Sequence, residues 1–295
     1  MFGKRQLWQD AVFDAAIIMI GIIILFIMAY PMYFVIIASV SDPTAVNSGK
    51  VWIIPSNINV EGYRRVFNDA RIWRGYRNTI IYTVAGTLIS LLFTLPAAYA
   101  LSRKDLVGRN FIMMYFVFTM FFSGGLIPTY LTMNSFKLTN TVWVLLIPFS
   151  VSVYNLIISR TFFASTIPLE LLEAAKIDGC SNARFFVSVV LPLSKAIVAV
   201  IGLYCAVGQW NQFFLSLIYV RNRELQPLQI VLRNILLQNQ IDEMTSSAFG
   251  TNEINRVADL MKYAIIIVST APVMCFYPFI QKYFAKGVMI GAVKG

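Results

Sequence analysis

The sequence of 295 residues contains no histidine and only three cysteines. Without an imidazole, it offers neither a histidine acid–base catalyst nor a histidine metal ligand. Cys180, Cys205 and Cys275 have no metal-binding spacing, so we interpret them as small hydrophobic residues. The phosphate-binding pattern G-x-x-x-x-G-K-[ST] is also missing, so we expect no ATP site in this chain. The sequence predicts neither a catalytic residue nor a bound metal or cofactor.

Charge is also scarce. Only 13% of the residues are charged and 58% are hydrophobic, and the mean hydropathy is +0.69. An ordinary soluble domain is about a quarter charged, so this composition indicates an integral membrane protein. A helix needs roughly twenty apolar residues to cross the hydrocarbon. Six uncharged windows approach or exceed that length, and the last extends past single lysines: Ala15–Val40, Thr79–Ser102, Phe111–Phe136, Leu138–Ser159, Ala196–Val220 and Tyr263–Ile280. We expect one all-α membrane domain over residues 1–295, with six transmembrane helices.

No acidic or basic side chain lies in the middle of a window. Ion-coupled carriers and proton pumps usually need such groups, so a secondary transporter is disfavoured and another subunit would have to supply energy. The net charge of +10 comes from short clusters at the window ends, which indicates membrane topology and not nucleic-acid binding. These basic residues divide evenly between the two sides. With the amino terminus inside, the basic residues on the outside lie mostly in two long loops, and charges in long loops influence membrane topology less. This favours both termini in the cytoplasm.

Several connecting segments have their own patterns. Apolar residues at helical spacing predict an amphipathic surface helix over residues 60–67 and another helix after Pro227. Prolines interrupt most windows and predict kinks. Ser123-Gly124-Gly125, just before Pro128, predicts a break in the third window.

A polar insert over residues 164–192 separates the fourth and fifth windows. Pro168 is suited to start a helix, Asp178-Gly179 to end it, and Ser181 or Asn182 to cap a second one. The insert then returns to the membrane through Leu191-Pro192. We expect a rigid knob for a partner protein, with carboxylates (Glu173, Asp178), a low surface (Ala174, Ala175) and aromatic bulk for a groove (Phe185, Phe186).

The spacing of Glu173-Ala174-Ala175, Asp178-Gly179 and Leu191-Pro192 resembles the EAA motif of permease subunits in bacterial ABC importers. Other segments resemble the MalG-like, carbohydrate-uptake branch of that family: Tyr99-Ala100-Leu101-Ser102-Arg103 with Gly108, Trp210-Asn211-Gln212-Phe213-Phe214, and the tail 286–295. Val189 and Cys180 are mild departures, from the usual isoleucine and the common alanine.

The resemblance implies a type I importer permease fold in the bacterial cytoplasmic (inner) membrane, with both termini and the insert in the cytoplasm. The insert would occupy a cleft of an ATPase subunit, and the tail, through Gly291, Lys294 and Gly295, would reach between two ATPase subunits. Those subunits would bind ATP and Mg²⁺, so this chain would not be an enzyme. A second permease subunit and an extracytoplasmic solute-binding protein would complete the complex.

Further segments, Phe122–Tyr130 and Gly287–Gly291, resemble a subgroup that imports oligo- or polysaccharides such as alginate and pectin-derived uronates. Aromatic and amide side chains bind sugars, so Tyr204, Asn211, Gln212 and Tyr130 are candidates for the substrate path. Hydrogen bonding between helices explains the two amides equally well. Arg71, Arg74 and Arg77 could attract a uronate, although contact with lipid headgroups is the commoner role.

Two other functions remain open at this stage. The chain could import another solute, such as a peptide, or serve as a membrane scaffold or sensor subunit that docks a partner through the same insert.

Overall fold

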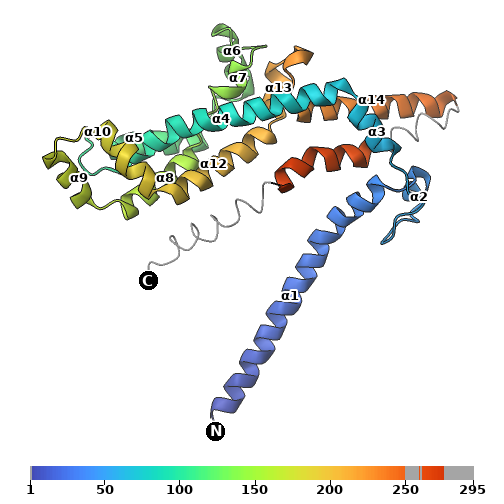
Figure 1. Ribbon diagram of the computed structural model, residues 1–295, viewed down its shortest axis with the longest axis horizontal. Coiled ribbons are helices and arrows are strands. Elements are labelled where there is room, and N and C mark those ends of the chain that lie inside the picture. Colours follow the sequence, from blue (N-terminus) through green and yellow to red (C-terminus); the bar gives the residue numbers. More distant parts are fainter. Residues whose placement is uncertain (1, 250–258, 260, 276–295) are drawn as a thin grey trace. The chain divides into compact units, whose positions relative to one another are not determined.

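A computed structural model describes the chain except for residues 1, 250–258, 260 and 276–295. The predictions for the tail and for the end of the sixth window therefore lie outside the described residues. All regular structure in the described part is helical (Figure 1). The chain forms two compact units, each described by itself: a first unit of residues 1–69 and 234–271, and a second unit centred on residues 70–233.

The first unit is dominated by α1 (Phe2–Ser39), whose apolar part from Asp10 to Ser39 is long enough to cross a membrane. Beyond it, α2 (Pro43–Asn47) and α3 (Glu61–Asn68) form a small cap, with Ile37, Val46 and Val51 buried together. The predicted amphipathic helix is confirmed as α3. Val66 is its fully buried residue, whereas Phe67 is exposed.

The second unit is organised around α4 (Ala70–Ser102), a helix about 50 Å long at 1.5 Å per residue. It packs along α8 (Val153–Thr166) and α12 (Lys195–Trp210). Small or hydroxyl-bearing residues recur every fourth position on its buried face, at Gly86, Ser90, Thr94 and Ala98. Such residues let helix backbones approach closely in a membrane protein. A Cβ at Gly86 would lie 2.6 Å from Nε2 of Gln209, so this glycine makes room for the glutamine.

The third window contains the predicted break. Helix α5 (Arg109–Phe121) and helix α6 (Leu126–Ser135) meet at an angle of 115°. Gly125, at the start of α6, has a φ of +83°, a conformation that is cheap only for glycine.

Two other windows are not single continuous helices in the structure. In the window 138–159, α7 (Trp143–Leu146) ends before Pro148, and α8 begins only after Ser152, whose Oγ accepts the N–H of Asn155. Proline lacks the N–H that would continue the first helix, and the serine caps a new one. In the window 196–220, residues 211–213 separate α12 from α13 (Phe214–Tyr219).

Among the described residues, two helices are long and apolar enough to cross a membrane, α4 and the apolar part of α1. Up to four crossings result if each of two bent pairs is one span. The second pair joins residues Asn182–Leu193 to α12 at 87°. Residues Leu228–Gln238 and Met261–Cys275 form shorter apolar helices. The predicted helix after Pro227 is confirmed as α14 (Leu228–Phe249), and η2 (Arg223–Leu225) is a single 3₁₀ turn before it.

Candidate functional site: the insert at the end of α4

The insert begins with α9 (Leu169–Ile177), which starts directly after Pro168 as predicted. Leu172 is the buried residue of this helix, at 5% exposure. Glu173, Ala174 and Ile177 are exposed, and Ile177 is 87% exposed. One side of α9 therefore packs against the rest of the second unit, while the side that carries most of the motif is exposed.

The turn after α9 is fixed by backbone geometry. Gly179 has a φ of +71°, and the backbone N–H of Cys180 donates to the carbonyl of Ala175 at 2.9 Å. This is a helix end of the kind that glycine stabilises. Ser181 then caps the next helix, α10 (Asn182–Phe185), because its Oγ accepts the N–H of Arg184. The predicted helix end and cap are confirmed.

The second half of the insert continues without interruption into the wide π-helical turn η1 (Phe186–Val190) and the short α11 (Leu191–Leu193). Leu191 and Pro192 lie in α11, just before the 87° bend into α12. The chain therefore re-enters the helical bundle at the predicted place.

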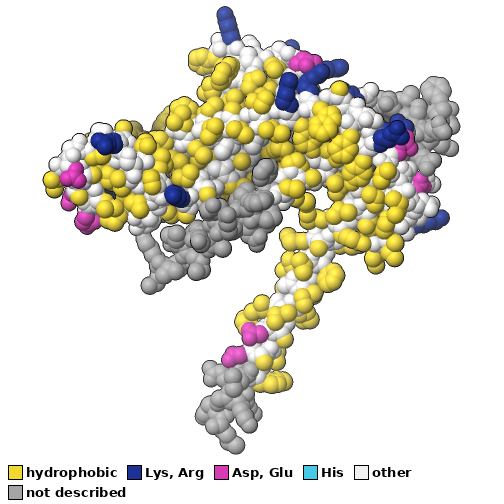
Figure 2. Space-filling view, viewed as in Figure 1, with side chains coloured by type: hydrophobic (Ala, Val, Ile, Leu, Met, Phe, Trp, Pro, Cys, Tyr) yellow, Lys and Arg dark blue, Asp and Glu magenta, His cyan; other side chains and the backbone are white. Residues whose placement is uncertain are grey.

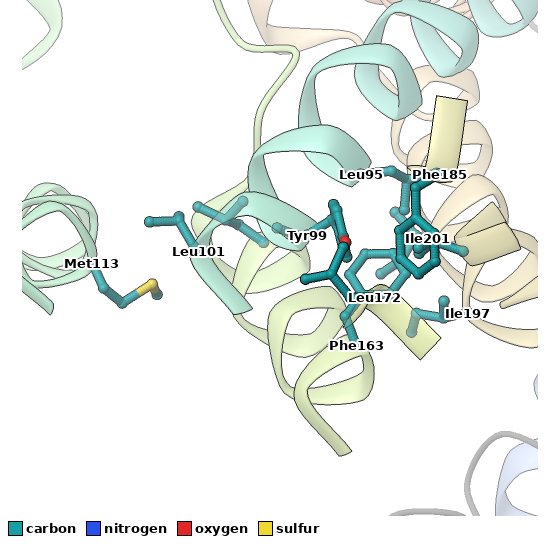
Figure 3. Close-up of a cluster of buried hydrophobic side chains, with 12 residues drawn as sticks. Leu95, Tyr99, Leu101, Met113, Phe163, Leu172, Phe185, Ile197 and Ile201 are labelled. Atoms are coloured by element: carbon teal, nitrogen blue, oxygen red, sulfur yellow. The ribbon is translucent and has the colours of Figure 1, made fainter. Parts of the chain in front are cut away.

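A buried aromatic cluster anchors the insert to α4 and α8 (Figure 3). The ring of Tyr99, in α4, lies 6.0 Å from that of Phe163 in α8, 6.4 Å from Phe185 and 5.4 Å from Phe186. Phe185 is only 1% exposed. The expectation that Phe185 offers bulk to a partner's groove needs correction, because the ring fills this chain's own core. Its place in the motif is that of an anchor.

Polar contacts from residues 103–108, the connection between α4 and α5, complete this anchoring. Arg103 Nη1 donates to Asn182 Oδ1 at 2.7 Å, and Arg103 Nε donates to Asp105 Oδ1 at 2.8 Å. Asp105 also lies 3.6 Å from the ammonium of Lys176 in α9. One short connection thus contacts both helices of the insert.

The same contacts set the electrostatics of Asp105. Hydrogen bonding to Arg103 lowers the pKa of Asp105 to about 2, because it favours the ionised carboxylate. Sequence analysis missed this group. The connection is short and basic in sequence, but nothing there shows that Arg103 reaches a residue 79 positions away.

A cleft of about 380 Å³ lies where α4, α8 and α9 meet, and its lining includes Tyr99, Arg103, Phe163, Pro168 and Leu172. Among the described residues, no group of three or more Cys, Asp or Glu side chains is placed to hold a metal ion. The geometry is that of a supported protein-docking element.

The predicted substrate-path residues lie at several places in the second unit. Tyr130, in α6, stacks on Tyr219 of α13 with ring centroids 5.8 Å apart. Tyr204 lies on α12, and Asn211 and Gln212 occupy the break between α12 and α13. Asn211 is exposed and Gln212 is half-buried. Their contact with a sugar stays a prediction.

Residues 65–290, more than half of the chain, match the family described as binding-protein-dependent transport system inner membrane component. The chain belongs to this family. It is therefore a multi-pass permease component of a transport system, and family membership implies a binding protein and an ATPase as partners.

Individual relatives agree over nearly the full length. The polygalacturonan/rhamnogalacturonan transport system permease protein YtcP of Bacillus subtilis is 38% identical over 97% of this chain and 100% of the relative. Protein LplC of the same organism is 39% identical over 90% of this chain and 89% of its own length. A solved bacterial ABC transporter involved in the import of the acidic polysaccharide alginate superposes with a TM-score of 0.84 at 34% identity, covering 94% of this chain and 98% of that one. The type I permease fold is confirmed.

Proposed function

We propose that this chain is a membrane-spanning permease subunit of an ATP-driven importer of acidic oligo- or polysaccharides. It pairs with a second permease and receives its cargo from an extracytoplasmic binding protein. Two cytoplasmic ATPase subunits bind ATP and Mg²⁺, so the chain itself is not catalytic. The insert 164–192, both termini and the tail with Gly291, Lys294 and Gly295 face the cytoplasm and the ATPases.

The construction of the insert carries this proposal. Glu173, Ala174 and Ile177 are exposed on a helix whose opposite side is fixed by Leu172. An exposed apolar side chain beside a carboxylate, on a rigid element, suits a partner's groove, because little conformational freedom is lost on binding.

A movement of the insert would reach the membrane helices by two routes. The first is the cluster of Tyr99, Phe163 and Phe185, which joins the insert to α4 and α8. The second is the continuous backbone through η1 and α11 into α12. Because packed cores resist deformation, α4, α8 and α12 would follow the insert when the ATPases close.

The relatives support the choice of cargo. One relative is named for the transport of polygalacturonan, and the solved transporter takes part in the import of alginate; both are uronate polymers. Import of labelled oligogalacturonate into proteoliposomes, in competition with a peptide of similar size, tests the cargo. Import of the peptide alone would refute it.

Docking is tested by Glu173→Arg in the reconstituted importer. We expect the cargo-stimulated rate of ATP hydrolysis to fall about tenfold or more, because a charge reversal at a docking surface places a like charge against a basic groove. Asp14→Arg is the matched control, since Asp14 is an exposed carboxylate on α1, in the first unit, and is not part of the insert. Equal hydrolysis in Glu173→Arg and wild type would refute docking through this helix.

A further inference from the structure

The second unit has an unequal distribution of charge between its two ends. Its acidic residues within 70–233 are Asp105, Glu170, Glu173, Asp178 and Glu224. The first four belong to the insert or to the connection that contacts it, so Glu224 alone lies toward the other end. Basic residues are numerous at that end, in the first turns of α4 and in the segment before α14: Arg71, Arg74, Arg77, Arg221 and Arg223.

Polar contacts join these two segments into one ordered surface. Asn78 Nδ2 donates to the carbonyl of Glu224 at 2.7 Å and to that of Gln226 at 3.1 Å. The hydroxyl of Tyr82 donates to the carbonyl of Leu225 at 3.0 Å. Arg74 forms an ion pair with Glu224 at 2.7 Å. The start of α4 thereby holds residues 224–226 in place.

The residues just before this segment are held from a second side. Asn140 Oδ1 accepts the backbone N–H groups of Arg221 and Asn222 at 3.1 and 2.8 Å, and the N–H of Asn140 donates to the carbonyl of Tyr219 at 2.7 Å. Arg221 and Arg223 are exposed on this scaffold, and Arg77, beside Asn78, is exposed too. We call Arg77, Arg221 and Arg223 the basic rim. Dark blue side chains gather over α13 in Figure 2.

The position of the rim argues against a role in topology. If the insert is cytoplasmic, as proposed above, the opposite end of α4 faces the outside. Arginine and lysine that orient membrane helices collect on the cytoplasmic side, so five arginines with a single carboxylate on the outer side need another explanation. A surface with several exposed arginines and one carboxylate, already paired with Arg74, attracts anions and concentrates them locally.

We propose that the basic rim binds the carboxylates of an acidic oligosaccharide as the cargo enters from the outside. This inference rests on the proposed function and assigns the rim a part in it. A uronate chain carries a carboxylate on every sugar unit, and an arginine fork binds carboxylates by two parallel hydrogen bonds. Three arginines on neighbouring segments suit such a repeating anion better than a neutral sugar.

The test uses the complete importer in proteoliposomes, with trigalacturonate and its carboxyl-reduced trigalactose as cargo. The variant Arg77→Gln/Arg221→Gln/Arg223→Gln should raise the KM for trigalacturonate about tenfold, at roughly twofold for each exposed charge contact, and leave the maximal rate unchanged. The KM for trigalactose should stay constant. The wild-type KM for trigalacturonate should also rise with salt, because salt screens exposed charges.

Two controls separate charge from structure. Replacing the same three residues by lysine keeps the charge but not the two parallel hydrogen bonds, so the KM for trigalacturonate should lie between those of the wild type and the glutamine variant. Lys50→Gln removes an exposed cation from the first unit and should have no effect.

The remaining outcomes overturn the proposal in different ways. An equal loss for both cargoes would assign the rim to docking of the binding protein. A loss confined to vesicles rich in anionic lipid would assign it to lipid headgroups. If the triple glutamine variant imports trigalacturonate with an unchanged KM, the role of the basic rim is refuted and the proposed function stands. If the wild-type importer transports only trigalactose, the acidic cargo of the proposed function is refuted.

Discussion

The anchoring of the insert by Phe185 gives the sharpest prediction. The ring is 1% exposed and contacts Tyr99, whereas Val187, two residues later, is 60% exposed. Phe185→Ala removes a buried ring, and such changes cost about 3–5 kcal/mol. Val187→Ala changes an exposed side chain and should stay within about 0.5 kcal/mol. The two variants therefore compare the loss of a buried side chain with the loss of an exposed one, two residues apart.

Hydrogen exchange of the backbone amides measures this difference directly. Local opening of the insert governs exchange in α9 and α10, so a loss of about 3 kcal/mol should speed exchange there by roughly two orders of magnitude. Exchange in the middle of α4 should change little. Phe185→Ala should also reduce cargo-stimulated ATP hydrolysis, while Val187→Ala should not. Unchanged protection of α9 in Phe185→Ala would refute the anchoring role and, with it, the first route of coupling.

Two further predictions concern the second unit. Asp105 has a pKa lowered from 3.8 to about 2, so its contribution to stability is present above about pH 4 and is lost as the pH falls toward 2. At pH 5, Asp105→Asn should therefore weaken the protection of the insert's backbone amides from hydrogen exchange, whereas near pH 2 the variant should match the wild type. An equal difference between variant and wild type at both pH values would contradict the ion pair with Arg103. Gly75→Ala would place a Cβ 3.0 Å from the backbone Cα of Leu228, and should lower the stability measured by thermal unfolding by about 1–3 kcal/mol. Gly208→Ala is the control and should leave stability unchanged, because a Cβ there would meet nothing within 4 Å. Equal melting temperatures for the two glycine variants would show that the contact at Gly75 can relax.

The local features of the insert could be predicted because single residues determine them. Pro168, Gly179 and Ser181 each act on the backbone next to them, and the structure has a helix start, a positive φ and a cap at these positions. The break before Pro128 was predictable for the same reason. These effects depend on few neighbours, so one sequence suffices.

Continuity and tertiary contacts were harder to predict. A hydropathy window measures how apolar a segment is, and not whether its helix is continuous. The window 138–159 is apolar throughout, yet the helix is interrupted around Pro148 and Ser152. The contact of Arg103 with Asn182 depends on how α4 and the insert pack. Phe185 looked like a ligand for a partner because sequence alone does not distinguish a ring that is exposed from one that fills the chain's own core.

The bend of 87° between residues 182–193 and α12 has a mechanical consequence. Two rigid rods joined at nearly a right angle change the direction of a movement that passes from one to the other. A displacement along the axis of the first rod becomes, at the joint, a displacement across the axis of the second. A push on the insert in the direction of residues 182–193 would therefore move the start of α12 sideways relative to α4, where Lys195 and Val198 share a cleft with Leu91 and Leu95 of α4.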